Sequence, residues 1–73
     1  MDERQYILDL GVSVKLLLTP EEAAEALGVK RTFLYGLLMS GQLVSVKVGL
    51  TRRIPVIALQ GYVEHLTQTQ KAG

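Results

Sequence analysis

Cysteine is absent from the 73-residue sequence, and histidine occurs once, at His65. The lack of cysteine excludes disulfides and thiolate metal sites, and a single histidine cannot supply the ligands of a zinc finger. Without disulfides or metal sites, a chain of this length forms one domain whose core contributes only ~3–5 kcal/mol to the stability of the fold. The absence of cysteine is also compatible with a reducing cytoplasm.

Long apolar runs are absent too, and the acidic start, Asp2 and Glu3, lacks the cationic region of a signal peptide. The sequence contains no nucleophile–base pair, no glycine-rich phosphate loop and no cluster of metal ligands. We therefore expect a soluble cytoplasmic protein that is not an enzyme, has no catalytic residues, and needs neither a metal nor a cofactor.

The formal net charge is only +1, but the charges are unevenly placed. Residues 19–29 contain three glutamates and no basic residue, whereas residues 30–53 contain five basic residues and no acidic one. Such an arrangement can present a basic face to a polyanion while the chain as a whole stays nearly neutral.

Residues 19–28, TPEEAAEALG, give the clearest helix signal. Thr19 suits the N-cap, Pro20 suits the first helical position, and Glu22 completes a capping box. Gly28 is placed to end the helix. The glutamates here are explained by capping and a solvated face rather than by catalysis.

A second helix is predicted from Lys30 to Ser40, with Gly41 as its stop, because three leucines recur there at helical spacing. Only Gly28 and Val29 separate the two predicted helices, which is the helix-turn-helix signature, although other helical hairpins share it. The leucine stripe consists of Leu34, Leu37 and Leu38.

Alternation of apolar and polar residues predicts a β-hairpin next. Val44, Val46 and Val48 should lie on one face, and a partner strand should return over residues 52–54. We expect Val48 and Ile54 to anchor this hairpin to the core.

Pro55 should end the hairpin and start a third helix. We divide the chain into an extended arm or short strand over residues 1–17, a folded domain over 18–66, and a polar tail over 67–73. The predicted core stripe of the third helix is Ala58, Leu59, Tyr62, Val63 and Leu66.

This order of elements and these residues resemble the excisionase-type branch of the MerR-like (mercury-regulator-like) DNA-binding domains. The typical pattern opens with T-x-E-E-A-A, continues with L-G-V-S-R and V-Y-x-L-I-x-x-G, and closes with V-K-V-G and R-I-P. The resemblance implies a small α+β winged helix, made of a helix-turn-helix, a two-stranded hairpin wing and a third helix. The matching residues are Thr19, Glu21–Ala24, Leu27–Val29, Arg31, Leu34–Tyr35, Leu37–Leu38, Ser40–Gly41, Leu43, Val46–Gly49 and Arg53–Pro55.

The resemblance places the second helix in the major groove of DNA. Its candidate contacts lie outside the leucine stripe; the alternative is an ordinary solvated surface. Three residues of this helix depart from the family pattern: Lys30 stands where a capping serine is usual, and Gly36 and Met39 occupy positions that are often basic in the family. The candidate DNA contacts of this helix are Lys30, Arg31, Thr32 and Tyr35.

The same resemblance makes the hairpin a wing beside an adjacent minor groove, where arginine is favoured electrostatically. Its candidate contacts are Lys47, Arg52 and Arg53. The alternative is a hairpin with unpaired charges, but residues 30–53 contain no acid to relieve their repulsion. Leu50 at the wing tip departs from the polar or basic residue that is common there.

The sequence also offers more apolar surface than a domain of this size needs. One alternative is that the N-terminal arm folds over the third helix of its own chain. The other is that these residues form contacts between neighbouring subunits, for example by exchange of the arm. The candidate residues are Tyr6, Ile7, Leu8, Leu10, Val56 and Ile57.

By resemblance, we expect a phage-type excisionase, a recombination directionality factor that binds adjacent DNA sites cooperatively, bends them and directs an integrase toward excision. MerR-like regulators continue into a dimerising helix and an effector domain, whereas this sequence ends after the third helix, which favours an architectural role. The expected partners are double-stranded DNA, a phage integrase and further copies arranged head to tail, in the cytoplasm of a bacterial host and without a membrane. The alternatives are a small transcriptional regulator and, from another class, a protein-interaction module.

Overall fold

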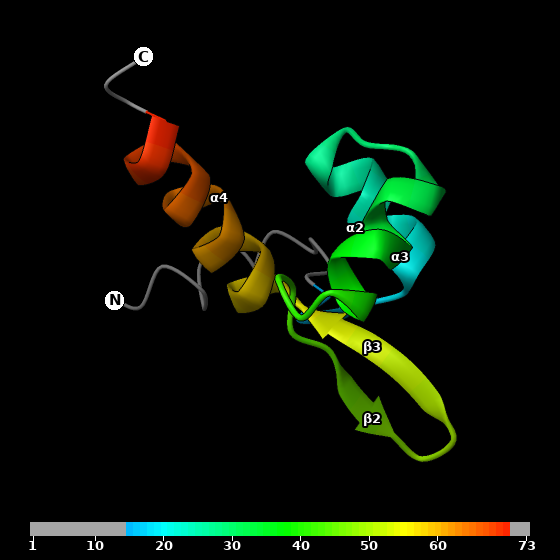
Figure 1. Ribbon diagram of the computed structural model, residues 1–73. Helices are drawn as coiled ribbons and strands as arrows, with labels where there is room; N and C mark the ends of the chain where they lie inside the picture. The colour runs from blue at the N-terminus through cyan, green and yellow to red at the C-terminus, as the bar shows by residue number, and fades with distance from the viewer. Residues whose placement is uncertain (1–14, 71–73) are drawn as a thin grey trace, which may run out of the picture.

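The computed structural model describes residues 15–70 of the chain (Figure 1). It is the small α+β winged helix that the sequence predicts, made of a helix-turn-helix, a hairpin and a further helix. A short strand precedes these elements and pairs with the hairpin. The elements in chain order are β1 (Leu17–Leu18), α2 (Pro20–Leu27), α3 (Arg31–Met39), β2 (Val46–Val48), β3 (Thr51–Pro55) and α4 (Val56–Gln70).

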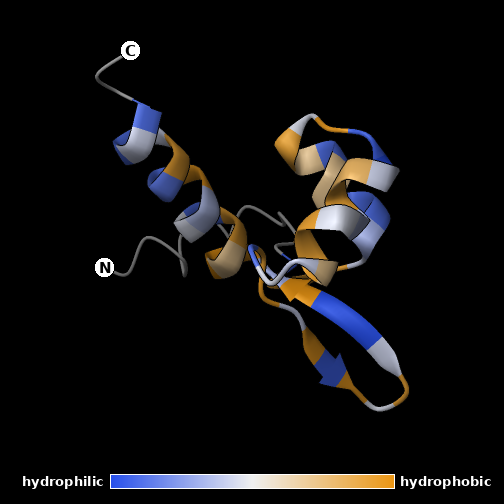
Figure 2. Ribbon diagram, in the orientation of Figure 1, coloured by the Kyte–Doolittle hydropathy of each residue, from blue (hydrophilic) through white to orange (hydrophobic). Residues whose placement is uncertain are grey.

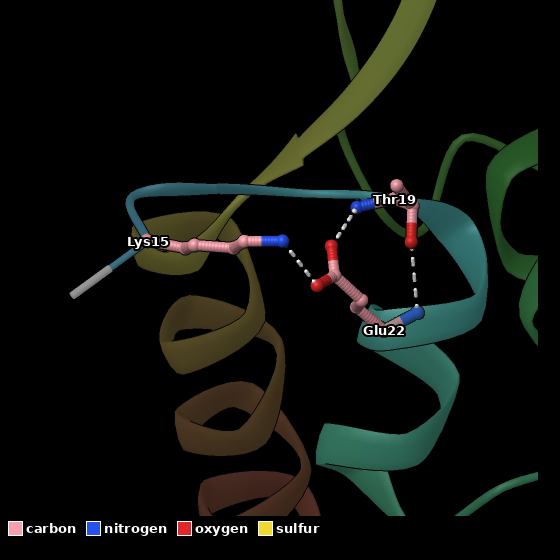
Figure 3. A network of polar contacts seen from close by, with 3 residues as sticks. All are labelled: Lys15, Thr19 and Glu22. Carbon is pink, nitrogen blue, oxygen red and sulfur yellow. Dashed lines mark hydrogen bonds and ion pairs between the residues drawn. The ribbon is translucent and has the colours of Figure 1, made fainter. Parts of the chain in front are cut away.

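The capping box predicted for α2 is confirmed. The Glu22 amide donates to Thr19 Oγ1 over 3.1 Å, and the Thr19 amide donates to Glu22 Oε1 over 2.9 Å (Figure 3). Lys15 Nζ lies 2.7 Å from Glu22 Oε2. The hydrogen bond from Lys15, and after it the one from the Thr19 backbone, lower the pKa of Glu22 to about 2. At the other end, Gly28 adopts the left-handed conformation, with φ of 73°, that closes the helix.

Helix α3 begins where expected but without a side-chain cap. Lys30 stands at the N-cap and makes no side-chain hydrogen bond to the helix, because its side chain carries donors only. Leu34 and Leu37 are buried and Leu38 is half-buried, so the predicted leucine stripe faces the core. Gly41, with φ of 80°, follows the C-cap residue Ser40.

The three strands form one sheet in the order β1-β3-β2. Strand β3 pairs antiparallel with both neighbours: Leu17 lies opposite Pro55 in one pair, and Lys47 lies opposite Arg52 in the other. The Val56 amide donates to the Leu16 carbonyl over 2.9 Å, which continues this pairing to the start of α4.

The core lies where the two helices of the helix-turn-helix, the base of the hairpin and the first half of α4 meet. Figure 2 shows apolar residues at the start of α4 and hydrophilic ones at its C-terminal end. Partly buried residues, among them Leu18, Ala58 and Tyr62, surround this cluster. The buried core residues are Ala23, Ala24, Leu34, Leu37, Leu43, Ile54 and Leu59.

The structure corrects the expectation that Val48 anchors the hairpin. Val44, Val46 and Val48 are 63%, 38% and 49% exposed, whereas Ile54 is fully buried. Val46 pairs with Arg53, the neighbour of Ile54, and successive side chains point to opposite faces. The valines therefore lie on the face opposite Ile54, and the helices of the described part of the chain pack against the Ile54 face.

Helix α4 is also longer than expected, because residues 67–70 are helical rather than part of a separate tail. Thr67 Oγ1 donates to the Val63 carbonyl over 2.8 Å, which continues the helical contacts. Of the predicted core stripe, Val63 is exposed, at 47%, whereas Leu66 is half-buried. Within residues 15–70, no helix combines the length and the apolar character that crossing a membrane requires.

Candidate nucleic-acid interface

Arg31 is held in place by residues of both helices of the helix-turn-helix. Its Nε lies 3.2 Å from Glu21 Oε1 on α2. Its guanidinium carbon lies 5.2 Å from the centroid of the Tyr35 ring, one turn further along α3, in a cation–π arrangement. Tyr35 is half-buried and Arg31 is exposed, so the ring supports the guanidinium from the side of the protein.

The charge of Arg31 is stable in this setting. The Tyr35 side chain, and after it the Glu21 carboxylate, raise the pKa of Arg31. Both members of the Arg31–Glu21 pair are more than half exposed, so solvent screens the pair and it contributes little to stability. Another anion can therefore displace Glu21 without a large loss.

Lys30 and Thr32, the other predicted contacts of α3, are also exposed. Lys30 lies at the N-cap, beside the positive end of the helix dipole. The structure thus brings Lys30, Arg31 and Tyr35 together at the N-terminal half of α3, next to the free amides of the first turn.

The hairpin places two cations directly opposite each other. Lys47 on β2 pairs in register with Arg52 on β3, and both side chains are exposed. Like charges at directly opposite positions destabilise a strand pair. Arg52 Nη1 donates to Ser45 Oγ over 3.1 Å, but a hydroxyl does not neutralise it. Among residues 15–70, no carboxylate forms an ion pair with Lys47 or Arg52.

Arg53 does not join this pair. It lies opposite Val46 on the other face of the hairpin, is half-buried, and donates from Nη1 to the Arg52 carbonyl over 3.2 Å. The three predicted wing contacts therefore divide over two faces. Lys47 and Arg52 share the face of Ile54, toward which the helices lie, and Arg53 lies among the exposed valines.

The predicted subunit-contact residues are placed only in part. Val56 lines an open apolar groove of about 420 Å³ between α2 and α4, and Ile57 is 76% exposed. Tyr6, Ile7, Leu8 and Leu10 lie outside the described residues. The groove is lined by Ala26, Leu27, Val56, Leu59, Gln60, Val63 and Glu64.

Residues 17–67 match the family model described as "Helix-turn-helix domain". The chain belongs to this helix-turn-helix family. It is also 47% identical over 58 residues to a protein of Saccharopolyspora erythraea named "Probable excisionase". The alignment covers 80% of this chain and 59% of that relative, so the chain spans about three fifths of the relative's length. No solved structure matches the chain significantly.

Two residues that contact the candidate site were not predicted from the sequence. Glu21 was explained as a first-turn glutamate of α2, and its ion pair with Arg31 depends on how the two helices pack. Ser45 alternates with the valines in the sequence, which is a signal for a polar contact across the hairpin, but alternation alone does not give the register that brings it to Arg52. No group of three metal-ligating side chains occurs in the described part of the chain.

Proposed function

We propose that this helix-turn-helix protein binds double-stranded DNA through α3 and the hairpin. In this proposal α3 lies in the major groove and the hairpin lies along a neighbouring minor groove. The proposed contacts of α3 are Lys30, Arg31, Thr32 and Tyr35, and those of the hairpin are Lys47, Arg52 and Arg53.

The main support is the Lys47–Arg52 pair. Two directly opposed cations without a carboxylate partner among the described residues repel each other in the free protein. A phosphate between them converts this repulsion into two charge-assisted hydrogen bonds. A polyanion is therefore the ligand that fits this face best.

Arg31 supports the same ligand. Its weak, exposed pair with Glu21 can be exchanged for a phosphate or a guanine edge, both of which accept two hydrogen bonds from an arginine. The Tyr35 ring keeps the guanidinium oriented during the exchange.

The similarity to a protein named "Probable excisionase" supports a finer proposal: the protein is an excisionase that directs an integrase toward excision, in the cytoplasm of a bacterial host. It would bind adjacent sites cooperatively and bend the duplex, which costs of order 1–6 kcal/mol per site. Contacts between neighbouring copies, arranged head to tail, would offset that cost. Val56, Ile57 and the apolar residues of the N-terminal arm are the proposed contact surface.

The test has two parts. Gel shifts on the attachment-site DNA of the element that encodes the chain should show cooperative complexes whose affinity falls steeply with salt. An in vitro recombination assay with the integrase of the same element should show excision that depends on the protein. Salt-dependent binding to a single operator without any effect on excision would favour a transcriptional regulator. Binding that does not respond to salt would refute the DNA proposal and favour a protein-interaction module.

A further inference from the structure

We propose that the outermost face of α3 selects DNA sites by contacting thymine methyl groups in the major groove. This face, called the outer ridge, consists of Thr32, Gly36 and Met39. The proposal rests on the DNA binding proposed above and names the base edges that α3 reads.

The spacing of these three residues places them on one face. Positions four and three residues apart are neighbours on a helix surface, and the buried residues of α3, Leu34 and Leu37, lie on the opposite side. All three are exposed, and Met39 is 88% exposed. A helix lying in the major groove with its leucines toward the core presents this ridge to the base pairs.

The chemistry of the outer ridge is unusual for a face directed at a polyanion. It carries no charge and no amide, and its only polar side-chain group is the Thr32 hydroxyl. The exposed cations lie elsewhere, at the start of α3 and on the hairpin, where they suit phosphates. Among the base edges of the major groove, the only apolar group is the C5 methyl of thymine. Contact with that methyl is what the side chains of Met39 and Thr32 can provide.

At the centre of the outer ridge, Gly36 has no side chain, so the helix backbone itself forms the surface there. A Cβ at this position would have no heavy atom within 4 Å, so packing within the described chain does not explain the glycine. Its φ is not positive either, and a glycine inside a helix is destabilising. Close approach of the helix backbone to an external surface does explain it. With Gly36 against the base pairs, Thr32 and Met39 reach base edges on either side.

The test uses DNA selected by the protein itself. The wild-type chain is first incubated with a random duplex pool, and the bound sequences should be enriched in thymine at defined positions. Each enriched thymine is then replaced by deoxyuridine, which removes only the methyl group. Loss of one buried methyl should weaken binding about four-fold, the ratio that corresponds to ~0.8 kcal/mol. At one position, Met39→Ala should bind thymine and deoxyuridine equally well.

A matched control removes an exposed apolar side chain that belongs neither to α3 nor to the hairpin. Leu16 precedes β1 and is exposed, so Leu16→Ala should keep the full response to deoxyuridine. Gly36→Ala gives a second, independent readout: the helix should become more stable while affinity for the selected duplex falls. Thermal melts of all variants show that they fold.

Three results would overturn the proposal: selected sites without thymine preference, equal binding of thymine and deoxyuridine by the wild type, or an unchanged deoxyuridine effect in Met39→Ala. In each of these cases salt-dependent binding can persist, and the proposed DNA-binding function then stands. Loss of salt-dependent binding in the wild type would instead refute both.

Discussion

Replacing Lys47 and Arg52 by glutamine should weaken DNA binding without weakening the fold. The two side chains lie directly opposite each other in the hairpin, exposed and without a carboxylate partner in the described residues. In the free protein their replacement removes a repulsion. The free energy of unfolding of the double variant should therefore be equal to or slightly above that of the wild type.

The effect on binding follows from counting charges. The five basic residues between positions 30 and 53, each contacting one phosphate, predict a slope of about −4.5 for log affinity against log salt. Without Lys47 and Arg52 the slope should be about −2.7. Between ~50 and ~200 mM salt, the affinity should fall about 500-fold for the wild type but only about 40-fold for the double variant.

Fluorescence anisotropy titrations of a labelled duplex at several salt concentrations measure both slopes. The swap of Lys47→Arg with Arg52→Lys keeps both charges in the hairpin and serves as the control, with a slope near the wild-type value. An unchanged slope in the glutamine variant would mean that the hairpin does not contact phosphates. A lower melting temperature of that variant would contradict the repulsion inferred from the register.

Three further predictions concern stability. The pKa of Glu22 falls from its ordinary 4.5 to about 2 in the folded state, so its stabilising contribution is complete above about pH 4.5 and is lost as the pH falls toward 2. Thermal melts across this pH range should show that loss of stability, and the loss should be smaller in Glu22→Gln. Gly36→Ala should raise the free energy of unfolding by ~1 kcal/mol in urea titrations, and an unchanged or lower value would mean that the site is less open than it is in this structure. Ile54→Ala should cost ~2–5 kcal/mol, most of the stability of so small a domain, and a circular dichroism spectrum with native helicity at 25 °C would contradict the central place of Ile54 in the core.

The features that the sequence predicted well are set by neighbouring residues. The capping box of Thr19 and Glu22 and the stop at Gly28 depend on hydrogen bonds within one turn, so local spacing reveals them. The leucine stripe of α3 is equally local. These local signals also gave the order of the elements, and the family resemblance then supplied their arrangement as a winged helix.

The features that the sequence did not predict depend on distant contacts. Alternation separated the two faces of the hairpin correctly, but which face is covered depends on where the helices pack, and the valines were assigned to the wrong side. An extended arm or short strand was expected over residues 1–17, but the pairing of Leu17 with Pro55 joins residues far apart in the chain, so the place of this strand in the sheet had no local signal. The Arg31–Glu21 ion pair likewise exists only because α2 and α3 pack against each other.

The place of β2 at the edge of the sheet also bears on solubility. Among the described residues, strand β2 pairs on one side only, and an exposed edge with a valine-rich face is a template for pairing with another chain. Two features limit this hazard: the strand has only three residues, and a lysine stands at its centre. The charge that we propose for DNA contact thus also protects the free protein from edge-to-edge aggregation, so DNA binding and solubility constrain Lys47 together.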